Sequence, residues 1–247
     1  MADRSSEQPV TSKATPSAAA THGLTAERSI GDGVRADAAR YAVLRRLAPA
    51  LRHKLMGELH PLGMVADLAA RRLQAAAPDL ANLRDCVSKI KEQTQAAAAS
   101  CIATIGWVAP EAASVTTLGQ GVIECMALLS AELGMRGFDL MPNMQGADAL
   151  VPQPALRDVL TASLLALTDA LTRPADIELT AATIDGRVEL RIEAHAADRV
   201  ADAVDRQIFR PIQWDDVAAL AAADAVGVIR GLDCVVLRYG ALSKPEA

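Results

Sequence analysis

The strongest constraint on the fold is a run of apolar residues that recurs at steps of three or four along residues 44–68. This spacing places the side chains on one face of a long α-helix. The stripe consists of Leu44, Leu47, Leu51, Leu55, Leu59, Leu62, Val65 and Leu68. A second apolar stripe recurs between residues 83 and 105, after a turn that contains Pro78 and Asp79. Since Pro78 cannot continue the first helix and Asp79 can cap the second, the sequence predicts an antiparallel helical hairpin over residues 35–110.

A single hairpin offers too little surface to bury both apolar stripes. Two hairpins packed together bury them in a four-helix bundle, so we expect a homodimer. Composition agrees with a helical core, because apolar residues make up 51% of the chain and aromatic residues only 2%. Alanine and leucine account for the difference, which favours helices packed through small side chains.

The pattern changes after Pro110, where alternating runs typical of strands follow helical segments. Asp185-Gly186 separates two alternating runs and predicts a β-hairpin over residues 176–196. The other expected elements are a strand and helix in 114–137, a strand at 138–144, a helix at 152–173, a helix at about 215–232 and a strand at 233–241. Residues 111–241 are therefore expected to form a separate unit of helices against a mixed sheet, and the fold class is α+β.

Charge and composition exclude several classes of protein. The net charge is −5, and no basic patch indicates nucleic-acid binding. No apolar run approaches the roughly 18 residues that a membrane span needs, and no apolar signal core is present, so a cytoplasmic protein is expected. The four cysteines show no CxxC pair and predict neither a metal site nor disulfides. Residues 1–30 are rich in Ser, Thr, Ala, Pro and charge, and are predicted to form a disordered tail.

The first predicted helix carries two histidines, His53 and His60, in the stretch LRHKLMGELHPLGMVADL. Seven residues correspond to nearly two helical turns, so His53, Gly57, His60 and Met64 share one face. His53 lies two residues from two leucines of the stripe and is expected to point away from it, into solvent. Both residues can also be interpreted as ordinary solvated surface histidines. A metal pair is not expected, because helical ligands lie three or four residues apart.

Two segments carry a resemblance to a known family. HKLMGEL, from His53 to Leu59, is similar to the phosphoacceptor segment H-x-[LI]-x-[NG]-x-[LV], and the helix from Leu156 to Ala170 resembles the helix that opens a nucleotide site. Over residues 40–241 the order of elements resembles the transmitter region of bacterial two-component histidine kinases. The resemblance implies a dimerisation and histidine-phosphotransfer hairpin, followed by a Bergerat-type (GHKL-like) α/β sandwich domain.

The chain also departs from this family at positions that serve ATP. Leu167 stands where the family has an asparagine that holds the nucleotide's magnesium, and leucine has no oxygen for a hard cation. No glycine occurs between Gly186 and Gly227, although the family's next nucleotide motif is D-x-G-x-G. Lys54 follows His53, where an active kinase usually has an acid. The departures imply a degenerate ATP-binding domain, and the chain resembles histidine phosphotransferases of the pseudo-histidine-kinase type.

The resemblance implies a phosphorelay function in signal transduction. A phosphoryl group would pass between His53, with His60 as second candidate, and an aspartate of a response-regulator receiver domain. An upstream histidine kinase would be a further partner, magnesium would be held by the receiver, and no cofactor of the chain itself and no autokinase activity are expected. Partner docking is expected at Lys54, Met56, Gly57 and Met64, whereas Asp158 and Asp169 are expected to be solvated or to cap helices. The alternatives are a divergent active sensor histidine kinase and a non-catalytic dimeric scaffold that binds a response regulator.

Overall fold

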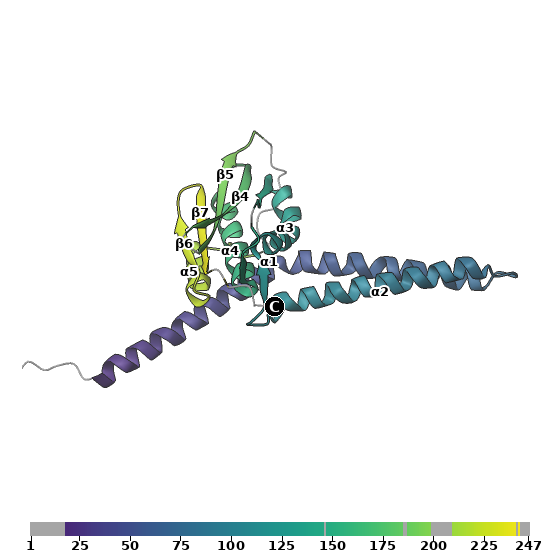
Figure 1. The fold of residues 1–247 in the computed structure, drawn as a ribbon, viewed down its shortest axis with the longest axis horizontal. Coiled ribbons are helices and arrows are strands. Elements are labelled where there is room, and N and C mark those ends of the chain that lie inside the picture. Colours follow the sequence, from purple (N-terminus) through teal and green to yellow (C-terminus); the bar gives the residue numbers. More distant parts are fainter. Residues whose placement is uncertain (1–17, 146, 185–186, 199–208, 241, 243–247) are drawn as a thin grey trace, which may run out of the picture.

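The computed structural model describes residues 18–145, 147–184, 187–198, 209–240 and 242, with side chains from residue 31 onward. Two long antiparallel helices, α1 (Ala18–Leu73) and α2 (Leu80–Val108), form a hairpin that projects from an α/β unit (Figure 1). The carboxylate of Asp79 accepts hydrogen bonds from the backbone N–H groups of Ala81 at 2.9 Å and Asn82 at 3.3 Å, which caps α2. The predicted hairpin and its turn are therefore confirmed.

Helix α1 is longer than the sequence indicates. It begins at Ala18, so residues 18–30 are helical where a disordered tail is expected, and residues 1–17 lie outside the described residues. No proline interrupts the chain between Pro16 and Pro49, and alanine recurs there, which favours helix. Pro49 and Pro61 lie within α1, and the helix changes direction beneath the α/β unit (Figure 1).

The α/β unit contains a mixed five-stranded sheet in the order β2-β4-β5-β7-β6. Strand β2 runs parallel to β4, and the other neighbouring pairs are antiparallel. A separate antiparallel pair joins β1 to β3. The strands are β1 (Val115–Thr117), β2 (Phe138–Asn143), β3 (Leu150–Pro152), β4 (Ala175–Ile184), β5 (Arg187–Ala196), β6 (Gly227–Arg230) and β7 (Cys234–Gly240), and the helices are α3 (Leu118–Met135), α4 (Gln153–Ala170) and α5 (Trp214–Ala223).

The core lies between the sheet and the helices of the α/β unit. The register places Leu179 beside Ile192 and Ile192 beside Val235, and all three side chains are fully buried. Alternate residues of the same strands are less buried, as expected for a sheet covered on one face. In α4, 13 of 18 residues are buried, which makes it the central helix of this unit. The α+β class and the order of hairpin before α/β unit are confirmed.

The predicted helix at 215–232 is wrong in its second half. Helix α5 ends at Ala223, and β6 follows as an edge strand paired with β7. Ala225 adopts a left-handed conformation with φ of 54°, which turns the chain out of the helix. Val228 and Ile229 then favour an extended strand, and pairing with β7 overrides the alanine-rich sequence before them.

In the described residues, no helix is both long and apolar enough to cross a membrane.

Candidate functional site

His53 lies on α1, in the part of the helix that pairs with α2. Its side chain is exposed, and so is the side chain of His60 two turns further on. Within the described part of the chain, neither imidazole has a hydrogen bond or an ion pair. A neutral imidazole with a free ring nitrogen can act as a nucleophile. His53 therefore meets the two basic requirements of a phosphoacceptor, which are solvent access and an uncommitted ring.

The residues around His53 leave space for a partner. A Cβ atom added at Gly57 would have no other atom within 4 Å. Lys54 is exposed, and so are the apolar side chains of Met56 and Met64. Exposed methionines are common on surfaces that bind other proteins. The predicted phosphoacceptor and docking residues of α1 thus all lie at the surface.

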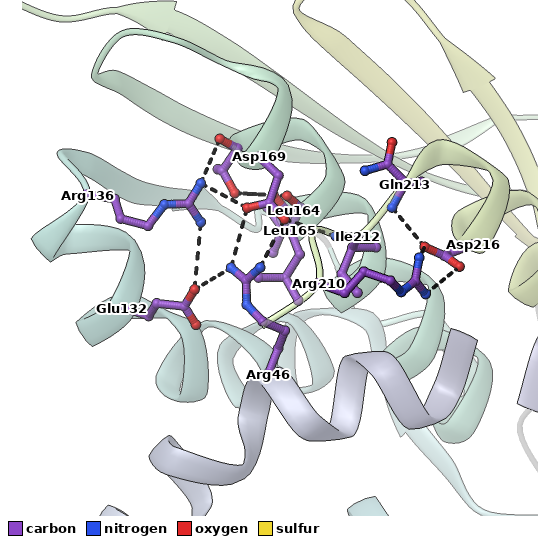
Figure 2. Close-up of polar contacts among 11 residues, drawn as sticks. Arg46, Glu132, Arg136, Leu164, Leu165, Asp169, Arg210, Ile212, Gln213 and Asp216 are labelled. Atoms are coloured by element: carbon purple, nitrogen blue, oxygen red, sulfur yellow. Dashed lines mark hydrogen bonds and ion pairs between the residues drawn. The ribbon is translucent and has the colours of Figure 1, made fainter. Parts of the chain in front are cut away.

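Arg46, seven residues before His53, indicates the direction in which the helix face that carries His53 points. One turn of α-helix takes 3.6 residues, so Arg46 and His53 leave the helix in nearly the same direction, about 10 Å apart along its axis. The Arg46 guanidinium pairs with Asp169 on α4 at 3.0 Å and with Glu132 on α3 (Figure 2). Arg46 therefore marks a side of α1 that contacts the α/β unit, and the helical repeat gives His53 nearly the same direction two turns later.

Asp169 is the centre of a buried polar cluster. Besides the Arg46 pair, it lies 2.9 Å from a guanidinium nitrogen of Arg136 and accepts a hydrogen bond of 3.0 Å from the backbone N–H of Ile212 (Figure 2). Its side chain is only 5% exposed. The expectation that Asp169 is a solvated or capping residue is wrong, because two arginines from different elements compensate its charge in the interior.

Asp158 belongs to a second cluster, where α1 meets the start of α4 and the end of α5. The Arg40 guanidinium lies 2.8 Å from Asp158 and 3.0 Å from Asp224, and 3.3 Å from the exposed Asp37. Burial raises the pKa of Asp158 and that of Asp224, and the charge of Arg40 offsets part of both shifts. Asp158 is therefore partly buried and paired, which also differs from the solvated residue that the sequence predicts.

The helix that resembles the family's nucleotide-site helix has no oxygen ligand at the asparagine position. Leu167, in the asparagine position, is 2% exposed and packs in the core. Asp169, two residues further along α4, pairs with two guanidinium groups and accepts a hydrogen bond from a backbone N–H. Magnesium binds through several oxygen ligands, of which Leu167 has none.

The sequence contains one indication of these two polar clusters, although it does not indicate which residues form the ion pairs. Asp158 and Asp169 are the only acidic residues of α4, which is otherwise almost wholly buried. An acid in a core helix requires a partner. The partner cannot be identified from sequence alone, because Arg46 lies 123 positions before Asp169.

No family model and no curated protein matches this chain. Similar solved structures include the Acinetobacter baumannii histidine kinase AdeS, with 10% identity, 74% of this chain and 98% of that chain covered, and a TM-score of 0.42. A histidine kinase from Burkholderia phymatum STM815 has 16% identity, covers 79% and 97%, and has a TM-score of 0.38. A bacterial phosphotransferase has 15% identity, covers 80% and 95%, and has a TM-score of 0.33. At these TM-scores the likeness assigns neither a family nor a function.

Proposed function

We propose that the chain is a dimeric phosphorelay histidine phosphotransferase of the two-component type. It passes a phosphoryl group between His53 and an aspartate of a response-regulator receiver domain, and does not use ATP. The observation that carries the proposal is an exposed His53 that has no partner among the described residues, with open space at Gly57 one turn further along the helix. The resemblance of the surrounding segment to a phosphoacceptor sequence supports the same residue.

The proposed step needs little covalent chemistry from the protein. A ring nitrogen of His53 attacks the phosphorus of the receiver's aspartyl phosphate through its lone pair, while the other nitrogen keeps its proton. The N–P bond forms as the P–O bond to aspartate breaks, and the carboxylate leaves with the bonding electrons. Catalysis then depends on positioning and on charge, and magnesium on the receiver supplies part of the charge. Lys54, exposed beside His53, adds a positive charge near the transferred group.

Dimerisation is supported by apolar surface that one hairpin leaves uncovered. Leu59 and Leu68 on α1 and Val87 and Ile105 on α2 are all at least 40% exposed. These residues belong to the two predicted stripes, and a second hairpin would cover them in a four-helix bundle. A surface of this extent along both helices is unusual for a protein that works as a monomer.

The absence of ATP use is inferred from the residues at the corresponding site. Leu167 offers no oxygen, Asp169 is held by Arg46 and Arg136, and the sequence lacks the glycines that let a backbone approach phosphate. The phosphoryl group would therefore come from another protein, such as an upstream histidine kinase that phosphorylates the receiver.

Two other candidate functions would give different experimental results. A divergent but active sensor histidine kinase would bind ATP and phosphorylate itself. A non-catalytic dimeric scaffold would bind a response regulator equally well after His53 is replaced. The phosphotransferase is favoured over the scaffold because the exposed His53 has no hydrogen bond or ion pair among the described residues, which leaves its ring nitrogen free to react.

The test is incubation of the full chain with a phosphorylated receiver, followed by detection of acid-labile, base-stable phosphate on the chain. His53→Gln should abolish this signal and His60→Gln should only reduce it. Arg52→Gln, an exposed neighbour on α1, is the matched control and should keep full transfer. Transfer that survives in His53→Gln but not in His60→Gln would reassign the acceptor. Transfer that survives in both variants would exclude this helix as the phosphorylated element.

A further inference from the structure

Helix α1 belongs to both parts of the molecule. Its residues 36–51 pack against the α/β unit, where Ala36, Ala39, Val43 and Leu47 are buried, and its later residues pair with α2. The helix passes directly beneath the α/β unit before it enters the hairpin (Figure 1). The orientation of the α/β unit relative to the hairpin is therefore decided by the contacts that α1 and the end of α2 make at this junction.

We propose that three arginines, Arg40, Arg46 and Arg157, hold the α/β unit in one fixed orientation on the hairpin. We call them the arginine lock. Each guanidinium connects a hairpin helix to a helix of the α/β unit through an ion pair or a hydrogen bond. The proposal does not depend on phosphorylation of His53, because it rests only on the contacts at the junction.

Arg46 forms the most buried connection of the lock. Its side chain is 6% exposed and joins α1 to α4 through Asp169 and to α3 through Glu132 (Figure 2). Hydrogen bonds between charged groups are strong in such a setting, and separating them would leave charges without partners in the interior. Movement of α1 away from α4 and α3 is therefore strongly opposed at this point.

Arg40 forms the second connection, on a different side of α1. Six residues separate it from Arg46, which corresponds to a rotation of about 120° around the helix. Its partner Asp158 lies eleven residues before Asp169, about three turns away on the same face of α4. Two attachments spaced along one face of α4 prevent this helix from pivoting about either of them. A pocket of about 400 Å³ borders Arg40, so this connection is more open to solvent than the one at Arg46.

Arg157 forms the third connection, at the end of α2. It donates a hydrogen bond of 2.9 Å to the carbonyl oxygen of Gly106, and its guanidinium lies 5.0 Å from the centre of the Trp107 ring. The same side chain, on α4, pairs with Glu124 of α3 at 3.0 Å. Because α2 is held as well as α1, rotation of the α/β unit requires at least two of the three connections to break.

The lock has a direct functional meaning. A unit that carries a bound nucleotide to a histidine on the hairpin has to move relative to the hairpin. A fixed unit cannot do this and only borders the helix. The arginine lock makes the second arrangement permanent. Any phosphoryl group that reaches His53 must then come from another molecule.

Hydrogen exchange of the full chain, followed by mass spectrometry, tests the lock. The double variant Arg40→Met/Arg46→Met removes both charges on α1 but keeps apolar stems of similar length. Amides of residues 36–51 and 102–108 should exchange at least tenfold faster, while amides of β4 and β5 keep their protection. Arg52→Met, an exposed arginine of the same helix, is the matched control and should change nothing. Unchanged exchange at both junction segments in the double variant would overturn the proposal.

A charge swap keeps the test decisive if the double variant unfolds. Arg40→Asp places a fourth acid beside Asp37, Asp158 and Asp224, and should speed exchange of residues 36–51. Adding Asp158→Arg restores an opposite charge at this junction and should return most of the lost protection. Failure of the second substitution to restore any protection would show that this ion pair does not hold α1.

Discussion

The Arg46 guanidinium and the Asp169 carboxylate lie 3.0 Å apart in the interior, although 123 positions separate them in the sequence. Asp169 lies on α4, the helix that resembles a nucleotide-site helix, two residues after Leu167, whereas Arg46 lies on α1. An acid that could have attracted a metal ion is thereby committed to holding two parts of the molecule together. This exchange of roles is the basis for the first prediction.

Magnesium and ATP should not bind. Because Asp169 is engaged and Leu167 has no oxygen, isothermal calorimetry with 1 mM magnesium–ATP should show no heat of binding. Thermal unfolding gives a second measurement, since a ligand with a Kd of about 1 μM would stabilise the protein by about 4 kcal/mol at that concentration. We expect no rise in Tm. A clear rise in Tm would contradict a phosphotransferase that does not use ATP, and would favour the divergent active kinase.

The full chain should be a dimer that depends on the exposed stripe of the hairpin. Val87→Asp should lower the mass measured by light scattering to that of a monomer, because dimerisation would bury the new charge. Val34→Asp is the matched control, since Val34 and Val87 are both 64% exposed in the single chain. The control should remain dimeric. Equal masses for both variants and the parent at every concentration would remove the support for a four-helix bundle.

Gly57→Ala should affect stability and transfer in opposite directions. The added Cβ meets no atom within 4 Å, and alanine favours helix over glycine by about 1 kcal/mol, so the free energy of unfolding should rise by about 0.5–1 kcal/mol. If Gly57 leaves space for the receiver, the rate of phosphoryl transfer should fall. Gly63→Ala is the control, because Gly63 is also helical with open space around it. It should give the same stabilisation without loss of transfer, as measured by urea unfolding and initial rates.

Asp224→Asn should reduce the dependence of stability on pH. Burial raises the pKa of Asp224, so the folded protein holds this proton more tightly than the unfolded chain does. The resulting stabilisation is complete below the unfolded pKa of about 4 and is lost as pH rises through the folded pKa. Asparagine imitates the protonated acid, so from pH 4 to pH 7 the urea midpoint should fall more in the parent than in the variant.

Asp37→Asn provides the control for this measurement, because Asp37 contacts the same Arg40 from an exposed position. Comparison with this variant separates the effect of position 224 from that of losing any one acidic contact to Arg40. A variant at position 224 whose midpoint falls more steeply than that of the parent, or one that is unfolded at pH 7, would show that the negative charge of Asp224 is required.

Long periodic elements are predictable from this sequence because each residue adds to one repeated signal. Helix α2, for example, is expected from the apolar stripe between residues 83 and 105 and runs from Leu80 to Val108. Strand β3 has only three residues, which is too short for any periodicity, and it exists through pairing with β1. Strand β6 is not predicted from sequence because the alanine-rich segment before it favours helix. It forms through pairing with β7. These elements depend on partners distant in the chain, which local patterns do not reveal.

The residues of the candidate site also include some that local sequence patterns predict and some that they do not. Exposure of His53 follows from its place between the leucines of α1, and helix geometry alone is enough to predict it. The Arg46 and Arg157 contacts depend on how α1, α2 and α4 come together, and neither residue differs from a surface arginine in the sequence. Burial of Asp158 and Asp169 is likewise a property of the assembled unit.

Arg46 and His53 are carried by one uninterrupted helix, and this continuity limits how the segment between them can vary. The identities of residues 47–52 can change wherever helix and packing are kept, but their number cannot. One inserted residue would turn His53 by about 100° around the helix axis, away from the side that Arg46 defines. An insertion of seven would restore the direction and move the histidine about 10 Å farther from the α/β unit. Substitutions that keep the helix and the packing of Leu47 and Leu51 should therefore be tolerated here, whereas insertions and deletions should be found elsewhere in the chain.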